Sequence, residues 1–421
     1  MVKRAILIGT YSGDQTKEEC EEQLNELQGL ADTYGVEVAL KVSCSIKKFH
    51  AGTFIGKGKI EEIGQQLQEL DCDVAIFDDE ISPQQQRNLE KIWATKAVID
   101  RTELILAVFA QRAETKEAKI QIELASCRYQ MPRLKRLWTH LSRQRTGGAG
   151  GGFLKGEGEK QIEIDRRIVR RQIDHLQSQI DEIVKNRQTQ RRARERRGIP
   201  TFAIIGYTNA GKSTLMKALT DADVFIEDKL FATLDTTTRQ FVLPNGQKIL
   251  LIDTVGFIRK IPHLLVAAFK STLEEALQAD ILLHLIDVSN KQAPAQAEAT
   301  LEVLKELGAK GKPIITVLNK IDRCPHRGYI DRIRFKYPKT VLISATKQEG
   351  FDALTKAMIQ EIHSLRKILH LRVPQSHYAL VAEVMNEGRV LFCEYQENDI
   401  VLEVEIPQSL EKKVALYQTE P

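Results

Sequence analysis

The segment from Gly206 to Ser213 reads GYTNAGKS and fits the pattern G-x-x-x-x-G-K-[ST], which is typical of phosphate-binding loops. It follows the apolar run FAII and precedes a helical pattern, which is the context that such a loop requires. Glycines let backbone N–H groups wrap a phosphate, and the following helix N-terminus adds its positive end. We expect Lys212 to reach the β- and γ-phosphates of a nucleotide and the Ser213 hydroxyl to bind Mg²⁺. The residues assigned to this loop are Gly206, Tyr207, Thr208, Asn209, Ala210, Gly211, Lys212 and Ser213.

A second string, NKID from Asn319 to Asp322, follows the apolar run PIITVL. Its aspartate can accept hydrogen bonds from the N1–H and the exocyclic amine of guanine, whereas adenine would leave the carboxylate unpaired. The string therefore favours a guanine nucleotide. We expect Asn319 to brace the loop, the Lys320 stem to cover the base, and a backbone N–H of the Ser-Ala pair to meet guanine O6. The residues assigned to base recognition are Asn319, Lys320, Ile321, Asp322, Ser344, Ala345 and Thr346.

A third string, DTVG, ends the apolar run KILLI, and its assigned residues are Asp253, Thr254, Val255 and Gly256. The Asp253 carboxylate can hold Mg²⁺ through a water molecule, and the Gly256 N–H can meet the γ-phosphate. The next residue is Phe257, where the best-known GTPases carry a glutamine that orients the attacking water. A phenyl ring forms no such hydrogen bond. The sequence therefore leaves open what positions the water.

The segment KLFATLDTTTRQ lies between the phosphate-binding loop and DTVG. In a GTPase, a threonine from this part of the chain must close over Mg²⁺ when the γ-phosphate is present. The candidates are Thr233, Thr236, Thr237 and Thr238. For most of them, β-propensity is the alternative explanation.

Apolar runs and turn signals divide the chain into four parts. Residues 1–112 alternate short strands with amphipathic helices, which predicts an N-terminal parallel α/β domain. Residues 113–198 form a predicted helical hairpin. Residues 199–369 carry buried strands and all three strings, which predicts a nucleotide-binding α/β domain with a parallel sheet. Residues 370–421 form a small C-terminal α/β appendage.

The predicted hairpin has apolar residues every three or four positions on both arms. Its arms are joined by RTGGAGGGFLKGEGE, where glycine disfavours regular helix, and Gly198 and Pro200 stop the second arm. Arginine is dense on both arms, and a glycine-rich tip allows close approach to a backbone, so the hairpin suits structured RNA. The alternative is a solvated helical face with a flexible linker. The basic residues considered are Arg128, Arg133, Lys135, Arg136, Arg143, Arg145, Arg166, Arg167, Arg170, Arg171, Arg187, Arg191, Arg192, Arg194, Arg196 and Arg197.

The composition of the 421 residues is that of a globular protein, with 42% hydrophobic and 28% charged residues. No apolar run approaches the ~20 residues of a membrane-spanning helix. Six scattered cysteines show no zinc-ligand spacing, so we expect a reducing, cytoplasmic environment. A formal net charge of +4 is too small to indicate nucleic acid by itself.

The strings GYTNAGKST, FATLD, DTVGFIRKIP and NKID together resemble the HflX-type GTPases of the Obg–HflX group, which are related to translation factors. TFIGKGKIEEI and the glycine-rich tip extend the resemblance over nearly the whole chain. The resemblance implies a multidomain α/β GTPase that requires Mg²⁺ and associates with the large ribosomal subunit in splitting, rescue or biogenesis. It also implies partners: GTP or GDP and ribosomal RNA. We expect a monomer when the chain is not bound to the ribosome.

The resemblance assigns roles within the site as well. It makes Thr233 the threonine that closes over Mg²⁺, so Ser213 and Thr233 are the expected metal ligands, and Lys212, Thr233 and Gly256 the expected catalytic residues. The residues around that threonine expected at the nucleotide are Phe231, Ala232, Thr233, Leu234 and Asp235. HflX-type proteins resemble GTPases with a hydrophobic residue in place of the catalytic glutamine. The water would then be positioned by switch backbone, by a monovalent cation or by a docked partner.

Asn209 is the candidate for a cation site, because several glutamine-lacking GTPases of this wider group use an asparagine there to coordinate K⁺. The alternative is a hydrogen bond within the loop. A separate string, GKGK from Gly56 to Lys59, suggests a second phosphate site, but a loop that opens a helix or contacts RNA phosphate explains it better than ATP binding. Two other functions stay open: an RNA-remodelling ATPase with a regulatory GTPase domain, and a signalling switch that binds a protein effector.

Overall fold

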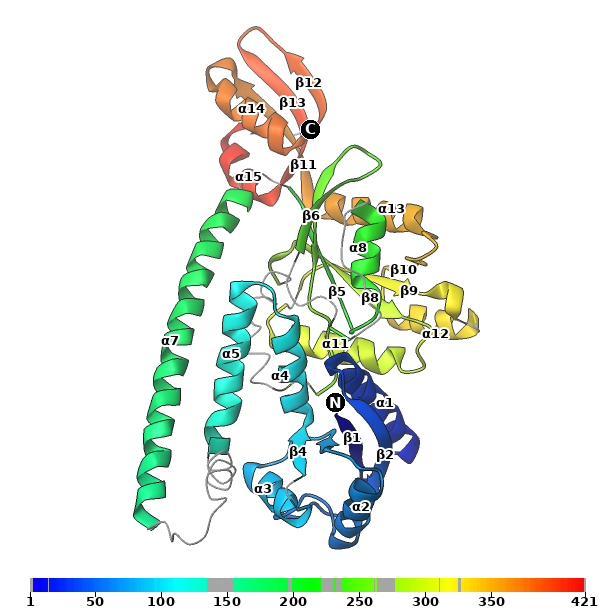
Figure 1. Ribbon diagram of the computed structural model, residues 1–421. Helices are drawn as coiled ribbons and strands as arrows, with labels where there is room; N and C mark the ends of the chain where they lie inside the picture. The colour runs from blue at the N-terminus through cyan, green and yellow to red at the C-terminus, as the bar shows by residue number, and fades with distance from the viewer. Residues whose placement is uncertain are drawn as a thin grey trace. The chain divides into compact units, whose positions relative to one another are not determined.

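The computed structural model of this chain (Figure 1) describes residues 3–13, 15–94, 96–134, 155–195, 199–220, 230–231, 237–260, 262, 277–309, 311–324 and 327–419. The chain forms two compact units. The first unit contains the described residues up to Glu182, together with Leu230, Phe231, Lys260 and Pro262. The second unit contains the other described residues from Ile183 onward.

The first unit contains a sheet of four parallel strands. Its elements are β1 (Arg4–Tyr11), α1 (Lys17–Tyr34), β2 (Glu37–Ser45), α2 (Lys57–Glu69), β3 (Val74–Phe77), α3 (Pro83–Ile92) and β4 (Ala97–Asp100). The strand order is β2-β1-β3-β4, and helices connect consecutive strands, as parallel pairing requires. A capping box between Thr16 and Glu19 starts α1. The parallel α/β fold predicted for this part of the chain is confirmed.

The GKGK string opens a helix. Gly56 immediately precedes α2, and Lys57 and Lys59 lie in its first turn. The Lys59 ammonium pairs with Glu62 at 2.7 Å, on the same helix. The helix-opening role, one of the two expected for this string, accounts for its position.

Two antiparallel helices form the predicted hairpin (Figure 1). After α4 (Arg101–Arg112), α5 (Lys116–Gln130) runs beside the first part of α7 (Lys155–Glu195). Arg128 Nη2 donates to Gln177 at 2.8 Å, and Gln172 Nε2 donates to Glu123 at 2.7 Å. The residues of α5 and α7 that follow the predicted apolar spacing and are buried are Ile120, Leu124, Cys127, Leu176 and Ile180. Burial of these two stripes holds the hairpin together.

The structure corrects the predicted start of the second arm. The sequence predicts that the glycine-rich tip interrupts helix as far as Glu159, but α7 begins at Lys155. Gly156 and Gly158 therefore lie in its first turn. The first N–H groups of a helix have no intrahelical acceptor, so glycine disrupts fewer bonds there than in the interior. The tip residues before Lys155 lie outside the described part of the chain.

Arg133 is a second correction, because it does not belong to the RNA-facing set. Its side chain is buried, donates to Ile81 O at 2.8 Å and to Asp100 Oδ2 at 3.2 Å, and lies over the Tyr129 ring. A buried guanidinium with these partners holds the loop after β3 against α5. Sequence spacing could not distinguish this arginine from its exposed neighbours.

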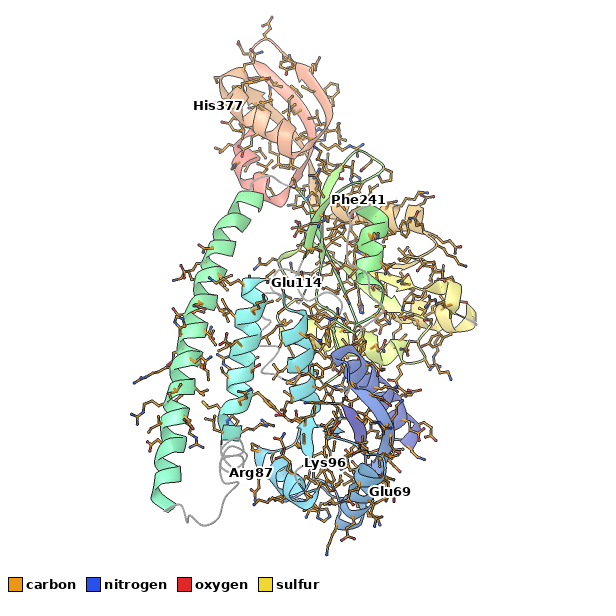
Figure 2. All side chains as sticks on the ribbon, in the orientation of Figure 1. Glu69, Arg87, Lys96, Glu114, Phe241 and His377 are labelled. Carbon is orange, nitrogen blue, oxygen red and sulfur yellow. The ribbon has the colours of Figure 1, made fainter. Side chains whose placement is uncertain are left out.

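The second unit contains a six-stranded sheet in the order β10-β9-β8-β5-β7-β6. The strands are β5 (Thr201–Gly206), β6 (Thr237–Val242), β7 (Lys248–Asp253), β8 (Ile281–Asp287), β9 (Ile314–Asn319) and β10 (Thr340–Leu342). All neighbours pair in parallel except the edge strand β6, which is antiparallel to β7. Phe241 of β6, labelled in Figure 2, packs against the core of this sheet. The helices of this part are α8 (Lys212–Thr220), α11 (Ala293–Glu306), α12 (Arg327–Lys336) and α13 (Phe351–Ser364).

The C-terminal part of the second unit is a small antiparallel sheet with helices. Its elements are β11 (Arg366–Pro374), α14 (Tyr378–Glu387), β12 (Arg389–Tyr395), β13 (Asp399–Pro407), α15 (Gln408–Val414) and β14 (Gln418–Thr419). Alternate residues such as Leu371 and Leu402 are fully buried beneath the helices. The mixed α/β appendage predicted here is confirmed. Within the described ranges, no helix is long and apolar enough to cross a membrane.

Candidate guanine-nucleotide site

The three sequence strings meet at one edge of the six-stranded sheet. β5, β7 and β9 are parallel, so the loops that follow them leave the sheet at the same edge. These loops begin at Gly206, Asp253 and Asn319, which are the last residues of their strands. Open α/β sheets bind ligands at the carboxyl ends of their strands. The topology therefore places the predicted phosphate and base residues around one site.

Lys212 occupies the phosphate-binding loop itself. Its ammonium donates to Tyr207 O at 2.8 Å and Gly206 O at 3.2 Å, and the side chain is buried. Burial lowers the pKa of Lys212 to about 8, an effect that the nearby Asp253 carboxylate opposes and the Lys320 ammonium reinforces. A bound phosphate would give this buried ammonium an anionic partner and would favour its charged form. This fits the predicted role of Lys212.

The residues expected near Mg²⁺ lie together. Ser213 Oγ donates to Asp253 Oδ2 at 2.7 Å, and the Asp253 side chain is completely buried. Hydroxyl and carboxylate oxygens are the ligand types that Mg²⁺ prefers. The donor set therefore fits the metal, which when bound would neutralise charge on the phosphates.

Gly256 packs tightly against the phosphate-binding loop. A Cβ at this position would come within 2.8 Å of the Thr208 methyl group and 2.9 Å of Lys212 Nζ. It would also come within 2.9 Å of Thr208 Cα, a backbone atom that can shift only with the loop itself. This crowding explains why the fourth residue of DTVG is a glycine.

Asn319 joins two loops of the site. Its buried side chain donates from Nδ2 to Ala210 O at 2.8 Å and accepts from Ala345 N at 3.0 Å. This is the bracing role predicted for it. Since Ala345 donates its N–H to Asn319, guanine O6 would compete for this donor.

Asp322 and Ser344 are also brought together, as base recognition requires. Ser344 Oγ donates to Asp322 Oδ1 at 2.7 Å, and this hydrogen bond lowers the pKa of Asp322. Asp322 is exposed. The carboxylate is therefore ionised, oriented and open to a ligand at neutral pH.

Comparison with known proteins agrees with this geometry. Three family descriptions match: "GTP-binding GTPase N-terminal" over residues 21–110, "GTP-binding GTPase Middle Region" over 112–194 and "50S ribosome-binding GTPase" over 201–320. The chain is 49% identical over 411 residues to GTPase HflX of Chlamydia pneumoniae, covering 97% of this chain and 87% of that one. The chain belongs to the HflX GTPase family.

A second relative supports the same assignment. GTPase HflX of Escherichia coli K12 is 43% identical over 371 residues, covering 86% of this chain and 85% of that protein. As a member of the HflX family, this chain binds and hydrolyses GTP. Among solved structures, a GTP-binding protein of Sulfolobus solfataricus in complex with GDP is 26% identical, with a TM-score of 0.45, covering 85% of this chain and 98% of that one.

One supporting residue of this HflX-family site was not predicted from the sequence. Asp287 ends β8, and its Oδ2 lies 2.8 Å from Lys320 Nζ, which also donates to Asn209 O at 2.8 Å. The ammonium of Lys320 thus ties the phosphate-binding loop to β8, besides the base-covering role predicted for its stem. The sequence signal that could have identified Asp287 is its position at the end of an apolar strand.

Two residues from the segments that flank DTVG in the sequence belong to the first unit. Phe231 is buried there with a φ of 55°, and its ring centroid lies 4.5 Å from that of Phe109 on α4. Lys260 Nζ lies 3.1 Å from the buried carboxylate of Asp78. Ala232, Thr233, Leu234 and Asp235 lie outside the described residues, so their predicted contacts with nucleotide and metal remain predictions.

Proposed function

We propose that this chain binds the large (50S) ribosomal subunit and couples GTP hydrolysis to splitting, rescue or biogenesis of ribosomes. The supporting observation is a cluster of exposed arginines on α7. Four arginines within six residues have exposed side chains that make no hydrogen bond or ion pair with the described part of the chain: Arg166, Arg167, Arg170 and Arg171. Guanidinium groups bind phosphate in a bidentate manner, and closely spaced cations release counterions from RNA.

The surroundings of this cluster are open to a partner. Ile164 and Ile168 are exposed on the same helix, so this stretch of α7 is accessible to a partner. Figure 2 shows side chains projecting from the middle part of α7. The family description that matches residues 201–320 names 50S ribosome binding. Ribosomal RNA is a partner that suits both the arginine cluster and this family description.

Within the GTPase part, we propose Ser213 and Thr233 as the Mg²⁺ ligands and Asp253 as a residue that holds the metal through water. Lys212 and the Gly256 N–H would stabilise charge that develops on the γ-phosphate. We also propose a cytoplasmic location and a monomeric state away from the ribosome. All six cysteines are free, which suits a reducing compartment.

Co-sedimentation with purified 50S, 30S and 70S particles tests the ribosomal proposal. The chain is loaded with a non-hydrolysable GTP analogue or with GDP, and we expect preferential binding to 50S with the analogue. Binding to no particle would support the protein-effector switch. ATP-dependent binding or RNA unwinding would support the RNA-remodelling ATPase.

A matched pair of variants tests the arginine cluster. Arg170→Gln/Arg171→Gln should weaken 50S binding and lower the slope of log affinity against log salt by roughly 2, because each guanidinium that neutralises a phosphate adds about one to that slope. Arg332→Gln/Arg334→Gln, which changes two exposed arginines of α12, is the control. Equal effects of both variants would show that only net charge matters.

The hairpin tip provides a separate test. Deletion of Gly147–Gly158 should leave GTP affinity unchanged, because no residue of that segment belongs to the three nucleotide strings. It should reduce 50S-stimulated GTP hydrolysis. Unchanged stimulation would mean that the tip is only a linker.

A further inference from the structure

The chain continues beside the phosphate-binding loop after DTVG. Phe257 N donates to Gly206 O at 3.0 Å, and Thr208 N donates to Phe257 O at 2.6 Å. Tyr207 and Phe257 thereby form an isolated parallel bridge beyond the ends of β5 and β7. Both the N–H and the carbonyl of Phe257 are therefore bonded to the predicted phosphate-binding loop.

A third hydrogen bond comes from a side chain. The hydroxyl of Tyr207 accepts from Arg259 N at 2.7 Å, and the Tyr207 side chain is 6% exposed. The Phe257 ring is 2% exposed. The ring is therefore packed in the protein interior, while the backbone from Phe257 to Arg259 is fixed at three hydrogen bonds.

We propose that Tyr207 is a positioning residue for GTP hydrolysis. Its hydroxyl holds the Arg259 amide, and so fixes the backbone that follows Gly256 against the phosphate-binding loop. Because the Phe257 N–H, the Phe257 carbonyl and the Arg259 N–H are engaged in these bonds, the group that they keep in place is the Gly256 N–H, which holds the γ-phosphate for attack by water where the chain lacks a glutamine side chain. Preorganised backbone groups serve this role without having to reorganise during the reaction. This role of Tyr207 applies to GTP hydrolysis by the chain alone and does not depend on ribosome binding.

The hydroxyl can be tested separately from the ring. Tyr207→Phe removes one oxygen atom and keeps the packing of the ring. The matched control is Tyr329→Phe in α12, whose hydroxyl donates to Asn290 O at 3.1 Å and Lys291 O at 3.0 Å. Both substitutions delete one tyrosine hydroxyl with backbone partners in the same unit, but only Tyr207 contacts the segment after DTVG.

The experiment is single-turnover GTP hydrolysis without ribosomes, together with titrations of GTP and GDP affinity. Tyr207→Phe should lower kcat by roughly threefold to tenfold, the rate equivalent of removing one hydrogen bond, with both affinities unchanged. Tyr329→Phe should match the wild type. An unchanged or raised kcat in Tyr207→Phe, an equal fall in the control, or a change confined to affinity would overturn the proposal.

A measurement on the wild-type protein removes any dependence on the folding of the variant. Hydrogen exchange of the Arg259 amide should be slow, because this N–H donates to a buried hydroxyl. It should be faster in Tyr207→Phe, with no change at Ile204 or Leu251 in the strand interiors. Exchange of the Arg259 amide in the wild type at the rate of an unprotected loop amide would also overturn the proposal.

Discussion

Ser344 Oγ lies 2.7 Å from Asp322 Oδ1, although the two residues are separated by 22 positions in the chain. The hydrogen bond orients the carboxylate and lowers its pKa. It also leaves the second carboxylate oxygen available to a ligand. Guanine presents two adjacent donors to such a carboxylate, and adenine does not.

Asp322→Asn should weaken GTP binding by on the order of a few kcal/mol, because the amide presents a donor where guanine needs an acceptor. Ser344→Ala should have a smaller effect, about 1 kcal/mol, since only the orientation of the carboxylate is lost. Calorimetric titration with GTP, ATP and ITP measures both effects. Asp331→Asn, at an exposed position of α12, is the control. Equal affinity of the wild type for GTP and ATP would contradict this account of selectivity.

GTP affinity should depend on the ionisation of Lys212. Burial lowers the pKa of this ammonium to about 8, and a bound triphosphate should raise it. Nucleotide binding then requires proton uptake above that pH. Affinity should fall about tenfold between pH 7 and pH 9, a range in which the terminal phosphate stays ionised.

Fluorescence titration with a labelled non-hydrolysable GTP analogue across this pH range measures the dependence on Lys212. Lys212→Arg is the control variant, because a guanidinium stays charged over the whole range. Its affinity should be lower overall but nearly independent of pH. A wild-type profile parallel to that of Lys212→Arg would assign the pH dependence to another group.

Potassium should accelerate hydrolysis if Asn209 helps to bind the cation. Asn209 has a φ of 60°, in the left-handed region that asparagine tolerates, and its backbone oxygen accepts from Lys320 Nζ. Hydrolysis should be faster in K⁺ than in Na⁺ at equal ionic strength, and Asn209→Ala should remove the difference. Phe257→Ala should retain measurable hydrolysis, because the ring orients no water. Identical wild-type rates in the two salts would exclude the cation.

His284 should make the second unit sensitive to acid. It lies in the interior of β8, is completely buried, and neither ring nitrogen has a hydrogen-bond partner in the described part of the chain. Burial lowers the pKa of His284 to about 4. The unfolded chain therefore binds a proton more readily, and stability should fall as the pH drops from about 6.5 to about 4, by roughly 3 kcal/mol in total.

Urea unfolding at several pH values, followed by hydrogen exchange of β8 amides, measures this dependence on His284. His284→Leu fills a similar volume without a titratable group, so its stability should vary less between pH 4 and pH 6.5 and should equal or exceed that of the wild type at pH 5. His377→Leu, at an exposed position of the C-terminal sheet region, is the control histidine. An unchanged pH profile in His284→Leu would show that other groups govern acid sensitivity.

The local strings and apolar runs were sufficient to predict much of this protein. The phosphate-binding loop is defined by contiguous residues whose conformation depends on glycine and on the following helix, so GYTNAGKS could be recognised without a structure. The buried strands were visible as continuous apolar runs because both faces of a parallel sheet are covered. Asn319 braces the loop, and Ser213 pairs with Asp253, because the parallel strands β5, β7 and β9 end at the same edge of the sheet.

Other features depended on contacts that no local pattern encodes. The burial of Arg133 depends on how α5 packs against the loop after β3, and nothing in its spacing separates it from exposed arginines. The antiparallel direction of β6, by contrast, has a local signal from which it could have been predicted: Asn245-Gly246 between β6 and β7 is typical of a tight hairpin turn, and Gly246 has a φ of 80°. The hydrogen bond between Tyr207 and Arg259 joins residues 52 positions apart. It exists because β5 and β7 pair in parallel, so the loops that follow them leave the sheet at the same edge. A side-chain hydroxyl can bind an amide this distant in the sequence only when tertiary packing has fixed both groups to within an ångström or so.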